Sequence, residues 1–346
     1  MFNQLKTKNM QDLVLSGAHT LTVLPPTFHA NAEDVEFEEV DAKKQNHFIE
    51  SNTQEISFEE LCKGSIIPNF ASNEETISHQ AFITAVADAA KDFFKDADFS
   101  DLEIRVSHPI KGRTRDAIGL KASELREDQK TIFYERMAFC VEIPSITTNV
   151  NGNTLALSIG GVRSYSETRL NSRKSPERFR IFIGFRNRVC TNLCISTDGF
   201  LEKLEVMSVG DIYLAALKLF SRYNADRDIQ LFNYLNNMII NETQFCQIIG
   251  RMRLYMALPC AEQKKLPQLL LGDSQINAAT RAYISDENFK NQGSVITGWQ
   301  MMNLLNGAAK SSYIDYFLER DVNATNFVFG IARALQGDPA YSWFLG

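Results

Sequence analysis

The sequence predicts an α+β fold, in which a twisted antiparallel sheet with packed helices is followed by an α-helical C-terminal domain. Ser78 precedes apolar residues spaced along one helical face, which predicts a helix over residues 78–96. Alternating apolar and polar residues predict strands over 131–143, 154–159 and 178–186. From about residue 208 onward the apolar spacing becomes that of helices.

The 346 residues divide into three predicted parts. Residues 1–64 contain Pro25-Pro26 and an acidic stretch from Glu33 to Asp41, with few periodic apolar positions, and predict an acidic, largely extended or disordered arm. Residues 65–200 form the predicted α+β domain, and residues 201–346 form the predicted α-helical domain.

Local signals place the strands of the middle part. Residues 102–106 predict a short strand, and residues 107–113 predict a mobile basic loop. Asn151-Gly152 supplies the positive backbone angles of a tight hairpin turn between two strands. In the strand over 178–186, one side carries Phe179, Ile181, Ile183 and Phe185, and the other side carries the arginines.

Several helices are predicted in the last third of the chain. Asn241 and Gln244 are placed as a variant of the capping box. The predicted helices contain the apolar positions of 245–255, 276–283, 299–305, 313–318 and 327–335.

The net charge of −6 is distributed unevenly. Residues 1–102 carry −11, residues 103–188 carry +7 and residues 189–346 carry −2. A basic, strand-rich segment inside an acidic protein indicates a polyanionic partner more strongly than the overall charge does.

The composition excludes some classes of protein. The sequence contains no run of about 18 apolar residues, which is the length needed to cross a bilayer. Residues 1–15 also lack the apolar stretch of a secretory signal. We therefore expect a cytoplasmic protein without a membrane partner. The six cysteines lie mostly in apolar runs, and Cys190 and Cys194 have no second pair that would complete a zinc site. We therefore expect core thiols and no metal.

The strongest candidate site is a basic face of the predicted sheet. Cations along a strand can neutralise phosphates, and aromatic rings among them can stack bases. We expect this face to bind DNA, single-stranded rather than duplex, through Arg178, Arg180, Phe182, Arg186 and Arg188, with Tyr134, Arg136 and Arg163 extending it and the loop residues Lys111, Arg113 and Arg115 clamping the strand.

Two other interpretations of this face remain open. Alternating arginines are also typical of the solvent-exposed face of a sheet that packs on one side only. Alternatively, they pair within the protein with Glu135, Glu142 and Glu177.

The sequence offers no catalytic residues and no cofactor motif. Three of the five histidines lie in the predicted arm, and no nucleophile elbow is present. Gly160-Gly161 and Gly184 lack the Lys-Ser/Thr of a phosphate loop and predict bulges or close backbone approach. The sequence therefore neither supports nor excludes an enzymatic activity.

Several phrases of the sequence look familiar together, those at residues 67–70, 76–79, 106–113, 134–139, 160–163, 182–194, 299–303 and 310–315. These phrases resemble an uncharacterised family, domain of unknown function 3871, carried on bacterial mobile elements. The resemblance covers about residues 65–346, and it implies a bacterial cytoplasmic protein of a plasmid, phage or conjugative element without implying any catalytic residue. Two of the phrases also resemble a wider phage and plasmid family.

The predicted order of elements is similar to the core of single-strand annealing proteins of the Rad-fifty-two type, which act as oligomeric rings. The leading hypothesis is a non-enzymatic DNA-binding protein of a mobile element that binds or anneals single strands, with a homo-oligomer implied by this likeness. The alternatives are a protein that inhibits a host defence or restriction system through its acidic arm, and a metal-dependent enzyme acting on nucleotides or DNA.

Overall fold

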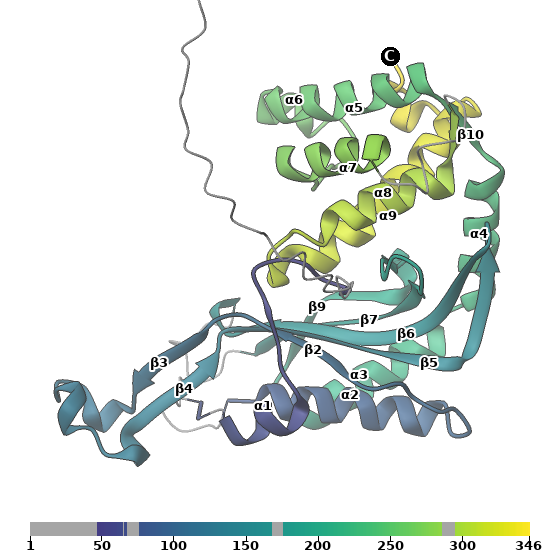
Figure 1. Cartoon of the computed structure of the whole chain (residues 1–346). Helices are drawn as coiled ribbons and strands as arrows, with labels where there is room; N and C mark the ends of the chain where they lie inside the picture. Colours follow the sequence, from purple (N-terminus) through teal and green to yellow (C-terminus); the bar gives the residue numbers. More distant parts are fainter. Residues whose placement is uncertain (1–46, 65, 68–75, 168–175, 286–294) are drawn as a thin grey trace, which may run out of the picture. The chain divides into compact units, whose positions relative to one another are not determined.

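The structure is a computed structural model that describes residues 47–64, 66–67, 76–167, 176–285 and 295–346. The account below concerns the described residues of the unit 46–346. An antiparallel sheet forms its centre, and helices cover both faces of the sheet (Figure 1). The predicted α+β class is confirmed.

The large sheet has seven strands in the order β1-β2-β5-β6-β7-β8, with β9 also paired to β7. Antiparallel pairing joins every neighbouring pair. At the predicted turn between β5 and β6, Asn151 and Gly152 have φ of 52° and 76°, which confirms the tight hairpin. The strands are β1 (Gln54–Glu55), β2 (Glu103–Val106), β5 (Arg136–Val150), β6 (Asn153–Ser164), β7 (Glu177–Asn187), β8 (Leu193–Cys194) and β9 (Phe200–Val206).

One face of the sheet packs on α2 (His79–Phe93) and α3 (Val209–Arg222) (Figure 1). Ser78 caps α2 as predicted, because its side chain accepts a hydrogen bond from the amide of Ala81. Phe82 on α2 contacts Phe179 of β7 with 4.7 Å between ring centroids. A Cβ on Gly161 would lie 2.5 Å from the Phe82 ring, so this glycine permits close packing in a regular ladder and not the predicted bulge.

The other face packs on the first half of α9 (Ile314–Leu335). Ile314, Phe317 and Leu318 share a buried cluster with residues of β5, β6 and β7. The sequence predicts two helices over 313–318 and 327–335, whereas the structure has one continuous helix. Asn323 lies inside this helix and uses its side chain to hydrogen-bond the backbone at Gln268 and Leu270, so it is not the start of a second helix.

The remaining helices follow β9 and pack around α8 and α9. The predicted capping box of Asn241 and Gln244 is confirmed. Side chains from both the sheet and these helices share one buried cluster, and the predicted division between residues 200 and 201 stays a prediction. The elements are α4 (Ala225–Asn237), β10 (Ile239–Asn241), α5 (Glu242–Ala257), α6 (Cys260–Gln263), α7 (Asp273–Ser285), β11 (Val295–Thr297) and α8 (Gly298–Ala309).

A separate two-stranded ribbon extends beyond the large sheet and consists of β3 (Pro109–Arg113) and β4 (Lys130–Tyr134) (Figure 1). Residues 107–113 were predicted as a mobile loop, but 109–113 are a paired strand. The strand predicted over 131–143 is interrupted at Glu135. There the Glu135 carbonyl accepts a hydrogen bond from the amide of Tyr165, and the Ser107 hydroxyl accepts one from the amide of Arg136.

Part of the predicted N-terminal arm is packed onto the large sheet. Of residues 1–64, those up to 46 lie outside the described residues. The rest include β1 and α1 (Phe58–Gly64), and Phe48 and Ile49 are fully buried. For residues 47–64 the prediction of an extended arm is therefore wrong, because Phe48 and Ile49 fill space beneath α9.

Candidate functional site

The arginines of β7 share one face as predicted, but that face is not open to solvent. Phe182 has no exposed surface and packs with Ile314 and Phe317 of α9. A ring enclosed between sheet and helix cannot stack on a base. The predicted cationic face is therefore the inner surface between β7 and α9.

Arg180 connects β7 to two other elements. Its guanidinium donates to both carboxylate oxygens of Glu167, at 2.5 and 2.9 Å, and to Glu319 of α9 at 2.8 and 2.9 Å. Burial by itself lowers the pKa of Arg180, but hydrogen bonds and charges from the two glutamates raise it above its ordinary value. This charge is already neutralised inside the fold.

Arg186 has similar internal partners. Its guanidinium lies 2.7 Å from Glu103 and 3.5 Å from Glu142, and it also lies over the ring of Phe48 at 5.9 Å. Arg188 forms a more exposed pair with Glu142 at 3.2 Å. Arg186 and Arg188 therefore form ion pairs within the protein, as one of the two other interpretations of the basic face proposed.

The other predicted cations of the large sheet are also engaged. Arg163 is fully buried, donates to the Ile77 carbonyl and to Glu177, and lies over the ring of Tyr165 at 4.3 Å. Burial lowers the pKa of this guanidinium. Arg136 lies 3.3 Å from Asp315. Arg178 is half exposed and pairs with Glu205 at 3.0 Å.

Three predicted residues do come together, on the β3–β4 ribbon. The antiparallel register places Pro109 opposite Tyr134, Lys111 opposite Ile132, and Arg113 opposite Lys130. Cross-strand partners project on the same side of a ribbon. We call this side the ribbon face, defined by Lys111, Arg113, Lys130, Ile132 and Tyr134.

The ribbon face is the solvent side of the hairpin. Lys111, Arg113 and Lys130 are exposed, whereas Thr131 and Phe133 on the opposite side are buried. Arg113 donates a hydrogen bond to the Leu120 carbonyl, and Lys130 forms an exposed pair with Glu127 at 2.6 Å. Such exposed pairs hold their charges weakly and remain accessible to other anions.

Lys130 belongs to the ribbon face but was missed by sequence reasoning. Lys130 joins the face only because of the cross-strand register, for which the alternating residues of 109–113 and 130–134 are the available signal. The side chain of Arg115 lies outside the described residues.

The base of the ribbon is fixed to the body of the protein. The Tyr134 carbonyl lies 2.7 Å from Nε2 of His79, whose pKa burial lowers to about 3, so this imidazole is neutral and donates the hydrogen bond. Ile66 and Ile132 exchange backbone hydrogen bonds of 2.7 and 3.1 Å. The cations thus stand on a scaffold with a defined orientation.

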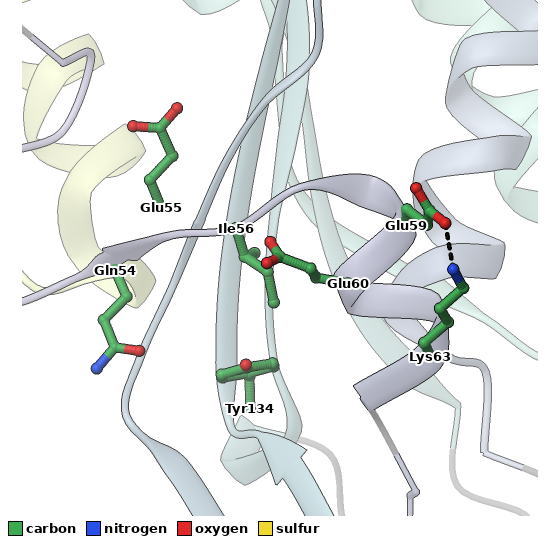
Figure 2. Close-up of a pocket in the computed structure, with 7 residues that line it drawn as sticks. All are labelled: Gln54, Glu55, Ile56, Glu59, Glu60, Lys63 and Tyr134. Atoms are coloured by element: carbon green, nitrogen blue, oxygen red, sulfur yellow. Dashed lines mark hydrogen bonds and ion pairs between the residues drawn. The ribbon is translucent and has the colours of Figure 1, made fainter.

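A pocket of about 480 Å³ adjoins the ribbon face at Tyr134 (Figure 2). Its other lining residues come from β1, α1 and the link between them. Three of them are glutamates, so the pocket is acidic where the ribbon is basic. The full lining is Gln54, Glu55, Ile56, Glu59, Glu60, Lys63 and Tyr134.

Three of the sequence phrases noted above meet at the end of β7, where they make a structural cluster. Asn303 of α8 accepts a hydrogen bond from the Asn187 side chain through its own side chain, and from the Asn192 side chain through its backbone carbonyl. The buried Lys310 amine donates to the Cys190 carbonyl and to Thr191, whose φ is +57°. These contacts fix a turn in which the backbone of Thr191 is strained.

Within the residues that the structure describes, no group of three or more His, Cys, Asp or Glu side chains could hold a metal ion. In that same part no helix combines the length and the apolar character needed to cross a bilayer.

A model of one protein family matches residues 30–345, nearly the whole chain. The chain belongs to the DUF3871 family. The description of that family is "Domain of unknown function, B. Theta Gene description", so DUF3871 membership confirms the resemblance seen in the sequence and assigns no activity. Searches of curated proteins and of solved structures gave no match.

Proposed function

We propose that this DUF3871 protein binds DNA through the ribbon face, with single strands preferred over duplex. The observation that carries the proposal is the register of β3 and β4, which aligns Lys111, Arg113 and Lys130 beside Tyr134 on an exposed surface. Lysine and arginine neutralise phosphates, and an aromatic ring beside them offers a platform for a base. The β7 arginines keep a structural role in this proposal.

The geometry of a ribbon suits a flexible strand. Residues two apart on one strand lie roughly 7 Å apart, so Lys111 and Arg113 present a row of charge along which a sugar–phosphate backbone can lie. Tyr134 stands at the end of this row that is nearest the large sheet. A single strand can follow the row and turn a base toward the ring, whereas the bases of a duplex stay stacked.

Other parts of the proposal come from the resemblance and the chemistry of the cysteines. A role in a bacterial plasmid, phage or conjugative element follows from the resemblance, and a homo-oligomer follows from the likeness to annealing proteins. A cytoplasmic setting suits the buried free thiols of Cys140 and Cys194, because such thiols persist where the environment is reducing.

The test is the salt dependence of binding to a fluorescent oligothymidylate. Each phosphate contact on a single strand contributes about 0.7 to the slope of log affinity against log salt concentration. We expect the variant Lys111→Gln/Arg113→Gln to flatten the slope by about 1.4 and to weaken binding at low salt. The matched control Arg178→Gln/Arg188→Gln removes two exposed arginines, one in β7 and one directly after it, and should keep the parent slope. An unchanged slope for the ribbon variant would refute the proposal.

A protein partner is the second candidate, because the ribbon tip exposes apolar side chains. Ile118 has 73% of its surface exposed, and Leu120 is also exposed. Exposed apolar residues at the end of a projecting element are typical of a protein-binding surface. Absence of binding to any oligonucleotide would favour this candidate. The acidic segment on which the inhibitor hypothesis depends lies outside the described residues.

A further inference from the structure

The acidic pocket beside the ribbon shares a wall with the ribbon face. Figure 2 shows Ile56 and the Glu60 carboxylate on the same side of the Tyr134 ring, while Glu59 turns away toward Lys63. The volume of about 480 Å³ falls in the range of pockets that hold small ligands. Tyr134 is therefore placed to contact one ligand that touches both surfaces.

The charges of the pocket exclude a phosphate. Glu55, Glu59 and Glu60 line it, and Glu59 forms an exposed pair with the single lining cation, Lys63. Like charges repel, so the sugar–phosphate backbone of a bound strand would stay on the lysines and arginines of the ribbon face. The part of a nucleotide that suits the pocket is its uncharged base.

Glu60 determines which base edge is favoured. One of its carboxylate oxygens accepts hydrogen bonds from the amide and the hydroxyl of Ser57, at 3.0 and 2.9 Å. These hydrogen bonds lower the pKa of Glu60, so the side chain is ionised at neutral pH and its second oxygen acts only as an acceptor. An acceptor pairs with an amino group and repels a carbonyl oxygen.

We propose that this pocket binds an unpaired nucleobase carrying an exocyclic amino group (adenine, cytosine or guanine), which stacks on Tyr134 and donates a hydrogen bond to Glu60. This inference rests on the proposed DNA binding and adds a base preference to it. Thymine presents carbonyl oxygens where these bases present their amino group, and its one donor, the N3–H, is flanked by two carbonyl oxygens that the carboxylate repels, so thymine is disfavoured.

The test compares oligothymidylates in which one central thymine is replaced by adenine, cytosine or guanine. At fixed salt we expect the wild-type protein to bind at least one substituted oligonucleotide about tenfold more tightly than the parent strand. In Glu60→Gln the amide oxygen can keep the contacts with Ser57, because glutamine serves in a capping box as glutamate does. The amide nitrogen would then face the pocket as a donor, and the preference should disappear or reverse.

A matched control variant is available, and the test separates failure of the pocket assignment from failure of DNA binding. Glu59→Gln also removes one negative charge from the pocket but leaves the Glu60 acceptor in place, so it should keep the base preference. If the wild-type protein binds all four oligonucleotides equally, or if Glu60→Gln keeps the preference, the pocket assignment is overturned while DNA binding by the ribbon stands. If none of the oligonucleotides binds, the proposed function fails and this inference fails with it.

Discussion

At the scale of single residues, burial decides what a charged side chain does. Arg163 and Arg178 lie near one another in the sequence, yet the first is enclosed against Tyr165 and Phe179, and the second is half exposed. The sequence around them is equally basic, so charge counting could not separate the two. The arginines of β7 were predicted to be open to solvent because residue type alone does not determine the burial of an individual side chain.

Asp321 is a buried acid for which the residue scale gives a prediction. This residue of α9 is fully buried, and burial raises the pKa of its carboxyl well above its ordinary value, with the amide of Ile195 and the charge of Lys310 offsetting only part of the effect. Folding thus favours the protonated form. The stability from this group is fully present below about pH 4 and is lost as the pH rises through the raised pKa of the folded state.

Replacing this acid should stabilise the protein at alkaline pH. We expect Asp321→Asn to raise the free energy of unfolding by about 1–3 kcal/mol at pH 8 and to change it little near pH 4, because the amide carries no charge at either pH. Denaturant unfolding at the two pH values measures this. The exposed Asp96→Asn serves as the control, with an expected change within about 0.5 kcal/mol at both pH values. A uniform loss of stability in Asp321→Asn would contradict the account.

At the scale of elements, local patterns predicted the strands and helices well. Residues 79–93 form the helix that Ser78 starts, and Phe179, Ile181, Ile183 and Phe185 line the core side of β7 as their alternation predicted. The packing of α9 on the arginine side of β7 was not predictable from local patterns. Glu319 lies 139 residues from Arg180 in the sequence, and no local period indicates such a contact.

The attachment of α9 to β7 gives the prediction at this scale. Arg180→Ala should leave the partly buried carboxylates of Glu167 and Glu319 without their buried partner and lower the free energy of unfolding by about 3 kcal/mol. Arg178→Ala, on the same strand, should cost less than about 1 kcal/mol, because its pair with Glu205 is exposed. Equal losses measured by urea unfolding would show that the first pair is not structural.

At the scale of the whole molecule, one hydrophobic cluster joins the sheet to the C-terminal helices, and the ribbon meets this cluster at its base through Tyr134. Phe232 of α4 contacts both Phe185 of β7 and Trp299 of α8, with 6.2 and 5.4 Å between ring centroids. The helices thereby cover the large sheet, and the exposed cations of the ribbon face remain outside this core. The register that assembles the ribbon face depends on the hairpin pairing and not on any single run of residues, which is why the sequence indicated only part of it.

The most direct test of this arrangement is photochemical crosslinking of a single-stranded oligonucleotide containing 4-thiothymidine, with the attached peptides identified by mass spectrometry. We expect crosslinks in residues 109–134, concentrated at Lys111 and Tyr134, and their loss when unlabelled single strand is added in excess. Crosslinks confined to residues 180–186 of β7 would contradict the account, because they would require DNA to reach Arg180 and Arg186, which are buried and paired with glutamates.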